Sequence, residues 1–296
     1  MIARILCPLS LSDVSRRTFD HALALGKWYQ ADVVALHVFA TWIPPDSLAT
    51  YPGWMRHVPE ARALIDQELS DLMRPAKAAG VDVPLTLREG DPASAIVEQA
   101  AGINADVIVM GAHPQGRFDR LRGGSVTEKV VRKARCAVLV VPARESMAPS
   151  VAGYRRIISA IDFSDCSRGA LAYALSIAGL TRASVTLLHV VGPDAAPPAA
   201  HERGGRGASP AVDAESAHGL LRATAHGHEG RGCAIETVVR AGASHQEIVR
   251  TAGELDADLL VMGARGRRVA DPAACGSTTT HVVRRPPCAV LTVRTT

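Results

Sequence analysis

Residues 105–141 read ADVIVMGAHPQGRFDRLRGGSVTEKVVRKARCAVLVV, and the pattern returns at residues 257–293 as ADLLVMGARGRRVADPAACGSTTTHVVRRPPCAVLTV. Eighteen of these 37 aligned positions are identical at a constant offset of 152 residues. The same offset places the Leu-His-Val of residues 36–38 on that of residues 188–190. Two copies are too few for a solenoid, so the chain is predicted to be a duplicated globular domain.

Each copy alternates short apolar runs with longer amphipathic segments. Continuous runs such as Val-Ile-Val-Met at 107–110 are typical of strands covered on both faces. The alternation predicts an α/β fold with a parallel sheet, right-handed crossovers and helices on both sides. In the first copy we expect strands at Ile2–Pro8, Asp32–Phe39, Val83–Leu87, Val107–Met110 and Cys136–Val141, and helices at Ser15–Trp28, Pro59–Ala79, Pro92–Ala101 and Ser125–Lys133.

The repeat places the expected domains at residues 1–143 and 154–296, with a linker over Ala143–Gly153. Residues 192–210, rich in proline and glycine, take the place of the aromatic segment 40–58 of the first copy. Both segments follow the end of a strand, where they either border a ligand site or form variable surface loops.

Composition excludes several classes of protein. With 296 residues, 47% of them hydrophobic, the chain is too apolar to be disordered throughout. The net charge is 33 − 29 = +4 and basic residues come at most in pairs, which disfavours a dedicated nucleic-acid binder. No run approaches the ~18 apolar residues of a membrane span. The six cysteines form no C-x-x-C pair and no signal peptide precedes them, so we expect a cytoplasmic protein.

Familiar catalytic signatures are missing from the sequence. It has no G-x-x-x-x-G-K-[ST] loop, no G-x-G-x-x-G after the first strand, no H-E-x-x-H and no G-x-S-x-G. His218, His226 and His228 lie close in sequence, but nothing beside them completes a ligand set, so we expect no metal site. Ser277 and His281 are four residues apart and, without an orienting carboxylate, indicate a polar helix face.

The second copy carries an ordered set of glycines after its fourth predicted strand. Gly263 and Gly266 follow the strand, and Gly276 and Ser277 open the next helix after nine residues. Glycine allows close approach to a ligand, and free N–H groups at a helix N-terminus form an anion site. Asp162 follows the first strand of this copy, where it would either accept a hydrogen bond from a ribose or cap the next helix.

These residues resemble the universal stress protein family, here as two fused domains. The family's G-x2-G-x9-G-[ST] nucleotide motif is matched by Gly263, Gly266, Gly276 and Ser277, and the Leu-His-Val at 188–190 and the closing Cys-Ala-Val-Leu-Thr-Val also match. The resemblance covers the chain except for the linker and the 192–210 segment. It implies a five-stranded parallel sheet of order 3-2-1-4-5 in each domain, sandwiched by helices. It also implies a pseudo-dimer in which the last strands, Cys136–Val141 and Cys288–Val293, pair within one chain.

For the second copy the resemblance implies an ATP site, with Mg²⁺ accompanying the nucleotide. Asp162 would contact the ribose, and Val190 and Met262 would line the adenine. Ala160 stands where a backbone contact to the adenine is expected. The phosphates would be held by Gly263, Gly266, Gly276, Ser277 and Thr278.

The first copy departs from this motif. Ser10 replaces the aspartate and Pro114 replaces the second glycine, although Gly124 and Ser125 remain. Proline removes an N–H donor, so we expect this copy to hold no nucleotide unless Gly116 compensates.

The sequence therefore predicts an ATP-binding stress-response regulator that acts on unidentified protein partners and is not an enzyme. A scaffold of the same fold without nucleotide is the main alternative. An adenylylating enzyme of the broader adenine-nucleotide α-hydrolase-like group is a third, but the loop after the first strand lacks glycines until Gly169. Whether two such chains pair again is left open.

Overall fold

The computed structural model describes residues 2–39, 54–112, 125–143, 153–192, 214–228, 232–266 and 274–295. The ten strands found there form one sheet in the order β3-β2-β1-β4-β5-β10-β9-β6-β7-β8. We call β1–β5 and their helices the first unit, and β6–β10 and theirs the second unit. The strands are β1 (Arg4–Pro8), β2 (Asp32–Phe39), β3 (Leu85–Glu89), β4 (Val107–Gly111), β5 (Ala137–Val141), β6 (Arg156–Ala160), β7 (Ser184–Val191), β8 (Ile235–Ala241), β9 (Leu259–Gly263) and β10 (Ala289–Val293).

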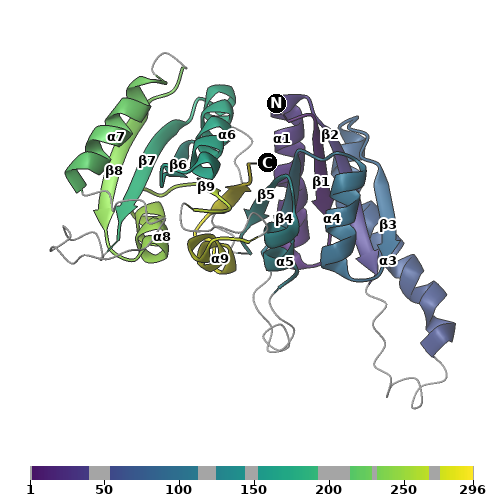
Figure 1. The fold of residues 1–296 in the computed structure, drawn as a ribbon. Coiled ribbons are helices and arrows are strands. Elements are labelled where there is room, and N and C mark those ends of the chain that lie inside the picture. The colour runs from purple at the N-terminus through teal and green to yellow at the C-terminus, as the bar shows by residue number, and fades with distance from the viewer. Residues whose placement is uncertain are drawn as a thin grey trace.

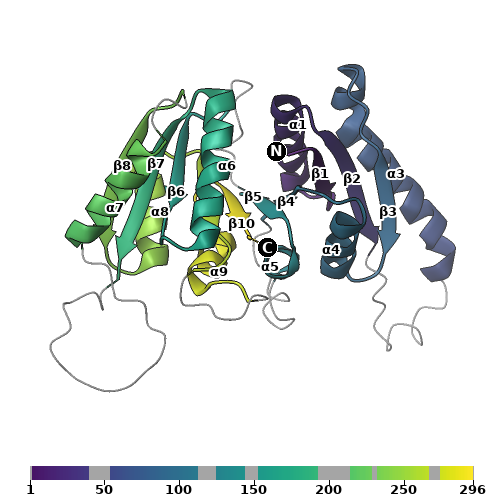
Figure 2. The same cartoon turned by 45° about the horizontal axis from the view of Figure 1, so that its top comes forward.

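Each unit has the expected 3-2-1-4-5 order of parallel strands. The two units join through β5 and β10, which pair antiparallel with Leu139 opposite Leu291. Figure 2 shows these two strands at the centre, with one unit on each side. The prediction that the last strands pair within one chain is therefore confirmed. This pairing gives each of the two strands a second neighbour and so leaves neither as an open edge.

Helices cover both faces of the sheet (Figure 1). One face carries α1 (Asp13–Tyr29), α3 (Trp54–Ala78), α6 (Asp165–Thr181) and α7 (Ala214–His226), and the other carries α4 (Pro92–Gly102), α5 (Val126–Lys133), α8 (Ser244–Glu254) and α9 (Ser277–Arg284). Alternate strand residues point to the two faces. Ile5 thus packs in the core beneath α1, and Leu6 packs in the core beneath α4 and α5.

An aspartate that the two copies share holds the first strand in the same way in both units. The carboxylate of Asp106 accepts hydrogen bonds from the N–H groups of Ala3 and Arg4, at 2.7 and 2.9 Å. Asp258 does the same for Arg155 and Arg156, at 2.7 and 3.1 Å. The repeated Ala-Asp before β4 and β9 therefore anchors the start of the first strand in each unit.

Most predicted boundaries differ from the observed ones by one or two residues, and three of the differences have a bearing on the fold or the site. Helix α3 begins at Trp54 rather than Pro59, and β3 runs two residues later than expected because its pairing with β2 begins at Leu85. Ser125 is not helical: its backbone is extended and its hydroxyl accepts the Glu128 N–H, so it is the N-cap of α5. None of the described helices is long and apolar enough to cross a membrane.

Candidate functional site

In the second unit the predicted site residues gather at the carboxyl ends of β6 and β9. These strands are neighbours, with Ala160 opposite Met262, and the chain leaves them for helices on opposite faces of the sheet. Such a switch point is where open α/β sheets bind ligands. Ala160, Val190 and Met262 all belong to the apolar cluster on the α8 and α9 side, so the structure brings these three predicted adenine-lining residues to one face.

Asp162 lies two residues beyond β6 and orders the turn into α6. Its Oδ1 accepts hydrogen bonds from the Ser164 N–H at 3.0 Å and from the Ser164 hydroxyl at 2.5 Å. The Ser164 Oγ in turn accepts the Ser167 N–H at 3.2 Å, which makes Ser164 the N-cap of α6. The turn also needs a left-handed residue, Phe163, with φ of 63°. Asp162 therefore supports the cap rather than being the cap itself.

The motif glycines of the second unit meet at Asp162. A Cβ atom on Gly266 would lie 2.7 Å from Asp162 Oδ2, and one on Gly276 would lie 3.7 Å from the Gly266 nitrogen. The Gly276 N–H also donates to the Ala264 carbonyl at 2.9 Å. The aspartate, the loop after β9 and the start of α9 therefore converge, and only glycine at 266 leaves the carboxylate in place.

Helix α9 begins without a side-chain cap. Gly276 is its N-cap residue and has no side chain to accept the first N–H groups, and the first turn carries no acidic residue. Ser277 is exposed and Thr278 is half-buried. The Thr279 hydroxyl donates to the Gly263 carbonyl at 2.9 Å, which ties the helix start to the end of β9. An uncapped helix N-terminus beside glycines is suited to an anion.

A thiol beneath this loop was missed by the sequence reasoning. Cys166 is buried at the start of α6, and its sulfur lies 3.1 Å from the Thr295 Oγ1. Arg265 donates to the Thr295 carbonyl at 3.2 Å. Burial raises the pKa of the Cys166 thiol, but the hydrogen bond with Thr295 and the Arg265 charge outweigh it, so the pKa falls below its usual value. A Cβ on Gly263 would lie 2.9 Å from the Cys166 Cβ, so the first turn of α6 packs directly against the strand end.

The histidines singled out in the sequence have structural contacts. His281 Nδ1 donates to the Ser277 carbonyl at 2.7 Å, and its ring stacks on His245 with centroids 4.5 Å apart. No group of three or more His, Cys, Asp or Glu residues in the described part of the chain is arranged to hold a metal ion.

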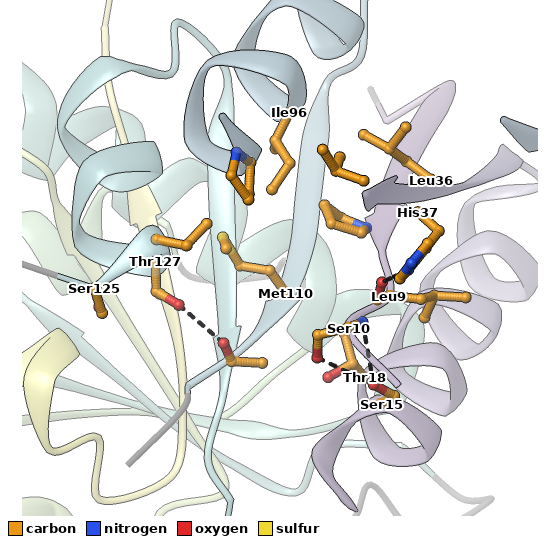
Figure 3. A pocket seen from close by; sticks show the side chains of 15 residues that line it. Leu9, Ser10, Ser15, Thr18, Leu36, His37, Ile96, Met110, Ser125 and Thr127 are labelled. Atoms are coloured by element: carbon orange, nitrogen blue, oxygen red, sulfur yellow. Dashed lines mark hydrogen bonds between the residues drawn. The ribbon is translucent and has the colours of Figure 1, made fainter. Parts of the chain in front are cut away.

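The first unit has a pocket at the equivalent place. About 330 Å³ lies between the ends of β1, β2 and β4 and the starts of α4 and α5. Apolar side chains such as Leu36, Ile96 and Met110 line it (Figure 3). Among the fifteen described residues that line it, none is an aspartate, glutamate, lysine or arginine.

Serine hydroxyls replace the aspartate in this pocket. Ser10 stands at the position of Asp162, and its hydroxyl lies 2.9 Å from that of Ser12 and 3.3 Å from that of Ser15. The positive φ of Leu11, 57°, matches that of Phe163, so the turn itself is retained. The polar wall is thus neutral where the second unit has a carboxylate.

Helix α5 differs from α9 at its first turn. The Ser125 hydroxyl accepts the Glu128 N–H at 3.3 Å, and the Glu128 carboxylate lies in the first turn. Val126 replaces Thr278. The differences between Glu128 and Thr280 and between Val126 and Thr278 can be read from the repeat. Both favour the predicted loss of nucleotide binding in the first unit. Pro114, Gly116 and Gly124, on which that prediction was based, lie outside the described residues, as do segments 40–53 and 193–213 of the two predicted loops.

Comparison with known proteins identifies relatives over the whole chain. The profile of the universal stress protein family matches residues 1–142 and 153–294. A universal stress protein of Methanocaldococcus jannaschii is 33% identical over 138 residues, which are 47% of this chain and 81% of that protein. One of Methanothermobacter thermautotrophicus is 30% identical over 142 residues, which are 48% of this chain and 96% of that protein.

Solved structures show the same fold. A universal stress protein from Archaeoglobus fulgidus superposes with a TM-score of 0.74 at 22% identity and covers 98% of this chain and 96% of its own. A putative universal stress protein from Pseudomonas aeruginosa has a TM-score of 0.64 at 18% identity, covering 99% of this chain and 93% of its own. The strand order and the two matched segments together show that the chain belongs to the universal stress protein family, as a tandem of two such domains.

Proposed function

We propose that the chain is a stress-response regulator that binds ATP, with its Mg²⁺, in the second unit. The observation that carries this proposal is the convergence of Asp162, Gly266 and the uncapped start of α9. An aspartate beside a glycine loop and a free helix N-terminus together suit a ribose with a phosphate chain.

Each predicted residue has a role in this proposal. The adenine would lie against Val190 and Met262, on the α8 and α9 side of the sheet, with the Ala160 backbone beside the ring. Asp162 would accept hydrogen bonds from the ribose hydroxyls while it also accepts those of Ser164. The phosphates would lie over Gly263, Gly266, Gly276, Ser277 and Thr278, where backbone N–H groups and two hydroxyls donate.

The regulator would act by binding rather than by catalysis. A bound nucleotide would change the surface beside the start of α9, and protein partners would respond to that surface. We place the protein in the cytoplasm and keep the domain boundaries at residues 1–143 and 154–296. The pairing of β5 with β10 makes the chain an internal pseudo-dimer.

A matched pair of variants tests the site. Asp162→Asn keeps an oxygen that accepts from Ser164 but removes the charge and the second carboxylate oxygen. Ser10→Ala changes the equivalent position of the first unit. We expect ATP affinity to fall at least tenfold in Asp162→Asn and to be unchanged in Ser10→Ala, measured by calorimetry. Equal affinity in all three proteins would show that Asp162 does not hold the nucleotide. No ATP binding by the folded chain would favour a scaffold that acts through partners alone.

A further inference from the structure

We infer that His245 and His281 of the second unit form a binding site for one divalent transition-metal ion, such as Ni²⁺ or Zn²⁺. The two residues belong to α8 and α9, which pack side by side on the same face of the sheet (Figure 1). They are far apart in the sequence, so the spacing of the histidines gives no sign of the site. The site needs no nucleotide and is therefore independent of the proposed function.

A hydrogen bond fixes the tautomer of His281. Its Nδ1 lies 2.7 Å from the Ser277 carbonyl oxygen, and because a carbonyl can only accept, Nδ1 carries the proton. The neutral ring therefore has its lone pair on Nε2, and the residue is exposed to solvent. Histidines that bind metal ions almost always donate their other ring N–H to a carbonyl or carboxylate in this way, which orients the ring and makes the free nitrogen a better ligand.

The second imidazole lies close to the distance that a shared metal ion requires. The ring centroids of His245 and His281 are 4.5 Å apart, and the ring planes differ by 28°. Two histidines on one tetrahedral ion, with metal–nitrogen distances of about 2.0–2.1 Å, have ring centroids roughly 5 Å apart. A small rotation of the two side chains therefore brings a nitrogen of each ring onto one ion.

The ring nitrogens of His245 are available to a ligand. The residue is half-buried at the start of α8, and in the described part of the chain its ring makes no hydrogen bond to another protein group. Imidazole nitrogen suits Zn²⁺, Cu²⁺ and Ni²⁺, whereas Mg²⁺ prefers oxygen. Since no third histidine, cysteine or carboxylate among the described residues completes the set, water molecules fill the remaining positions on the ion.

The first unit lacks both ligands. Ala93 and Lys129 are the counterparts of His245 and His281. Alanine has no donor atom, and a protonated lysine has no lone pair to offer a metal ion. The site is therefore specific to the second unit, and the first unit supplies the substitutions that remove it.

Calorimetric titration of the full chain with Ni²⁺ tests the site, with the protein free of tag, chelated metal and nucleotide. Ni²⁺ is the probe because thiolates select Zn²⁺ and the chain has six cysteines. We expect one ion per chain, with affinity at least tenfold lower in His245→Ala and in His281→Lys. His218→Ala, at an exposed position of α7, should bind Ni²⁺ as the wild type does. Mg²⁺ at the same concentration should not compete.

NMR of the histidine rings locates the ion. Ni²⁺ is paramagnetic, so the ring proton signals of His245 and His281 should broaden at lower Ni²⁺ concentrations than those of the other histidines. If either variant does not fold, this measurement on the wild-type chain decides the question.

Three results would overturn the inference: no saturable Ni²⁺ binding by the folded chain, equal affinity in the wild type and both variants, or broadening that begins at other histidines. One bound ion that is lost in both variants would uphold the site whether or not the chain binds ATP.

Discussion

The two units share a strand order and a turn geometry, and they differ where their first strands end. In the second unit a carboxylate, a glycine and an uncapped helix meet at Asp162. In the first unit three serines surround the same point, and Ser125 and Glu128 occupy the helix start. The comparison shows that the two units keep the same strand order and turn while the polar group at this point changes from a carboxylate to neutral hydroxyls.

Acid should lower the free energy of unfolding through a buried histidine, His21, that has no histidine counterpart in the second unit. His21 of α1 is buried, and its Nδ1 lies 2.8 Å from the hydroxyl of Tyr154, at the start of the second unit. Burial, followed by the Arg17 charge, lowers the pKa of His21 to about 3. The equivalent residue of α6 is Tyr173.

The sign of the effect follows from the lowered pKa. The unfolded chain takes up a proton on His21 below its ordinary pKa of about 6.5, which the folded chain does not. The contribution of His21 is present in full above pH 6.5 and is lost as the pH falls toward 3, at up to about 1.4 kcal/mol per pH unit. Urea unfolding of the wild type and of His21→Gln between pH 7 and 4 measures it. A wild-type slope equal to that of His21→Gln would contradict the assignment.

The glycine that ends the fourth strand should be structural in both units. A Cβ on Gly111 would lie 2.5 Å from the Val14 Cγ1, and one on Gly263 would lie 2.9 Å from the Cys166 Cβ. We expect Gly111→Ala and Gly263→Ala each to lower the free energy of unfolding by about 1–3 kcal/mol through overpacking. Thermal unfolding checks both variants. A loss in only one unit would show that the scaffolds are not equivalent here.

A carboxylate in the first turn of α9, as in α5, should weaken ATP binding. Thr280 is the counterpart of Glu128. Thr280→Glu places a carboxylate in the first turn of α9, and we expect ATP affinity to fall about tenfold because an anion at that terminus would be repelled. Thr280→Gln, which has the same size without the charge, should bind ATP within about threefold of the wild type. Equal affinity in the Glu and Gln variants would show that the helix terminus does not bear on the nucleotide.

The smallest expected effect concerns an ion pair that breaks the symmetry of the two units. Arg284 of α9 lies 3.0 Å from the Glu128 carboxylate, whereas the symmetric partners would be Arg132 and Thr280, which cannot form an ion pair. Because Arg284 is half-exposed, we expect a coupling energy of about 0.5 kcal/mol. A double-mutant cycle with Glu128→Gln and Arg284→Ala measures it. Zero coupling energy at low salt would show that this ion pair does not stabilise the contact between the two units.

The repeat made most of the fold predictable. The repeat predicted two copies of one α/β domain. The family resemblance implied the strand order and the pairing of Cys136–Val141 with Cys288–Val293, and the structure confirms both. The start of α3 was missed because the segment before Pro59 shows no clear helical period. The roles of Asp162 and Ser164 depend on which oxygen accepts which N–H, and sequence spacing leaves both residues equally able to cap α6.

The first-unit pocket could not be predicted from spacing. The loss of a motif glycine and an aspartate indicates weaker nucleotide binding, but it says nothing about whether the crevice has filled with side chains. In the first unit a pocket of about 330 Å³ remains, and Leu36, Ile96 and Met110 line it. The effect of Glu128 likewise required the helix start to be located at Val126.

The most direct test of a single working nucleotide site is calorimetric titration of the chain with ATP and Mg²⁺, beside a Gly266→Pro variant that carries the residue of the first copy. Proline at this position removes an N–H donor and crowds the Asp162 carboxylate. We predict one ATP per chain in the wild type and none in Gly266→Pro, with both proteins folded. Two ATP molecules per chain, or undiminished binding in the variant, would contradict the assignment of the nucleotide to the second unit.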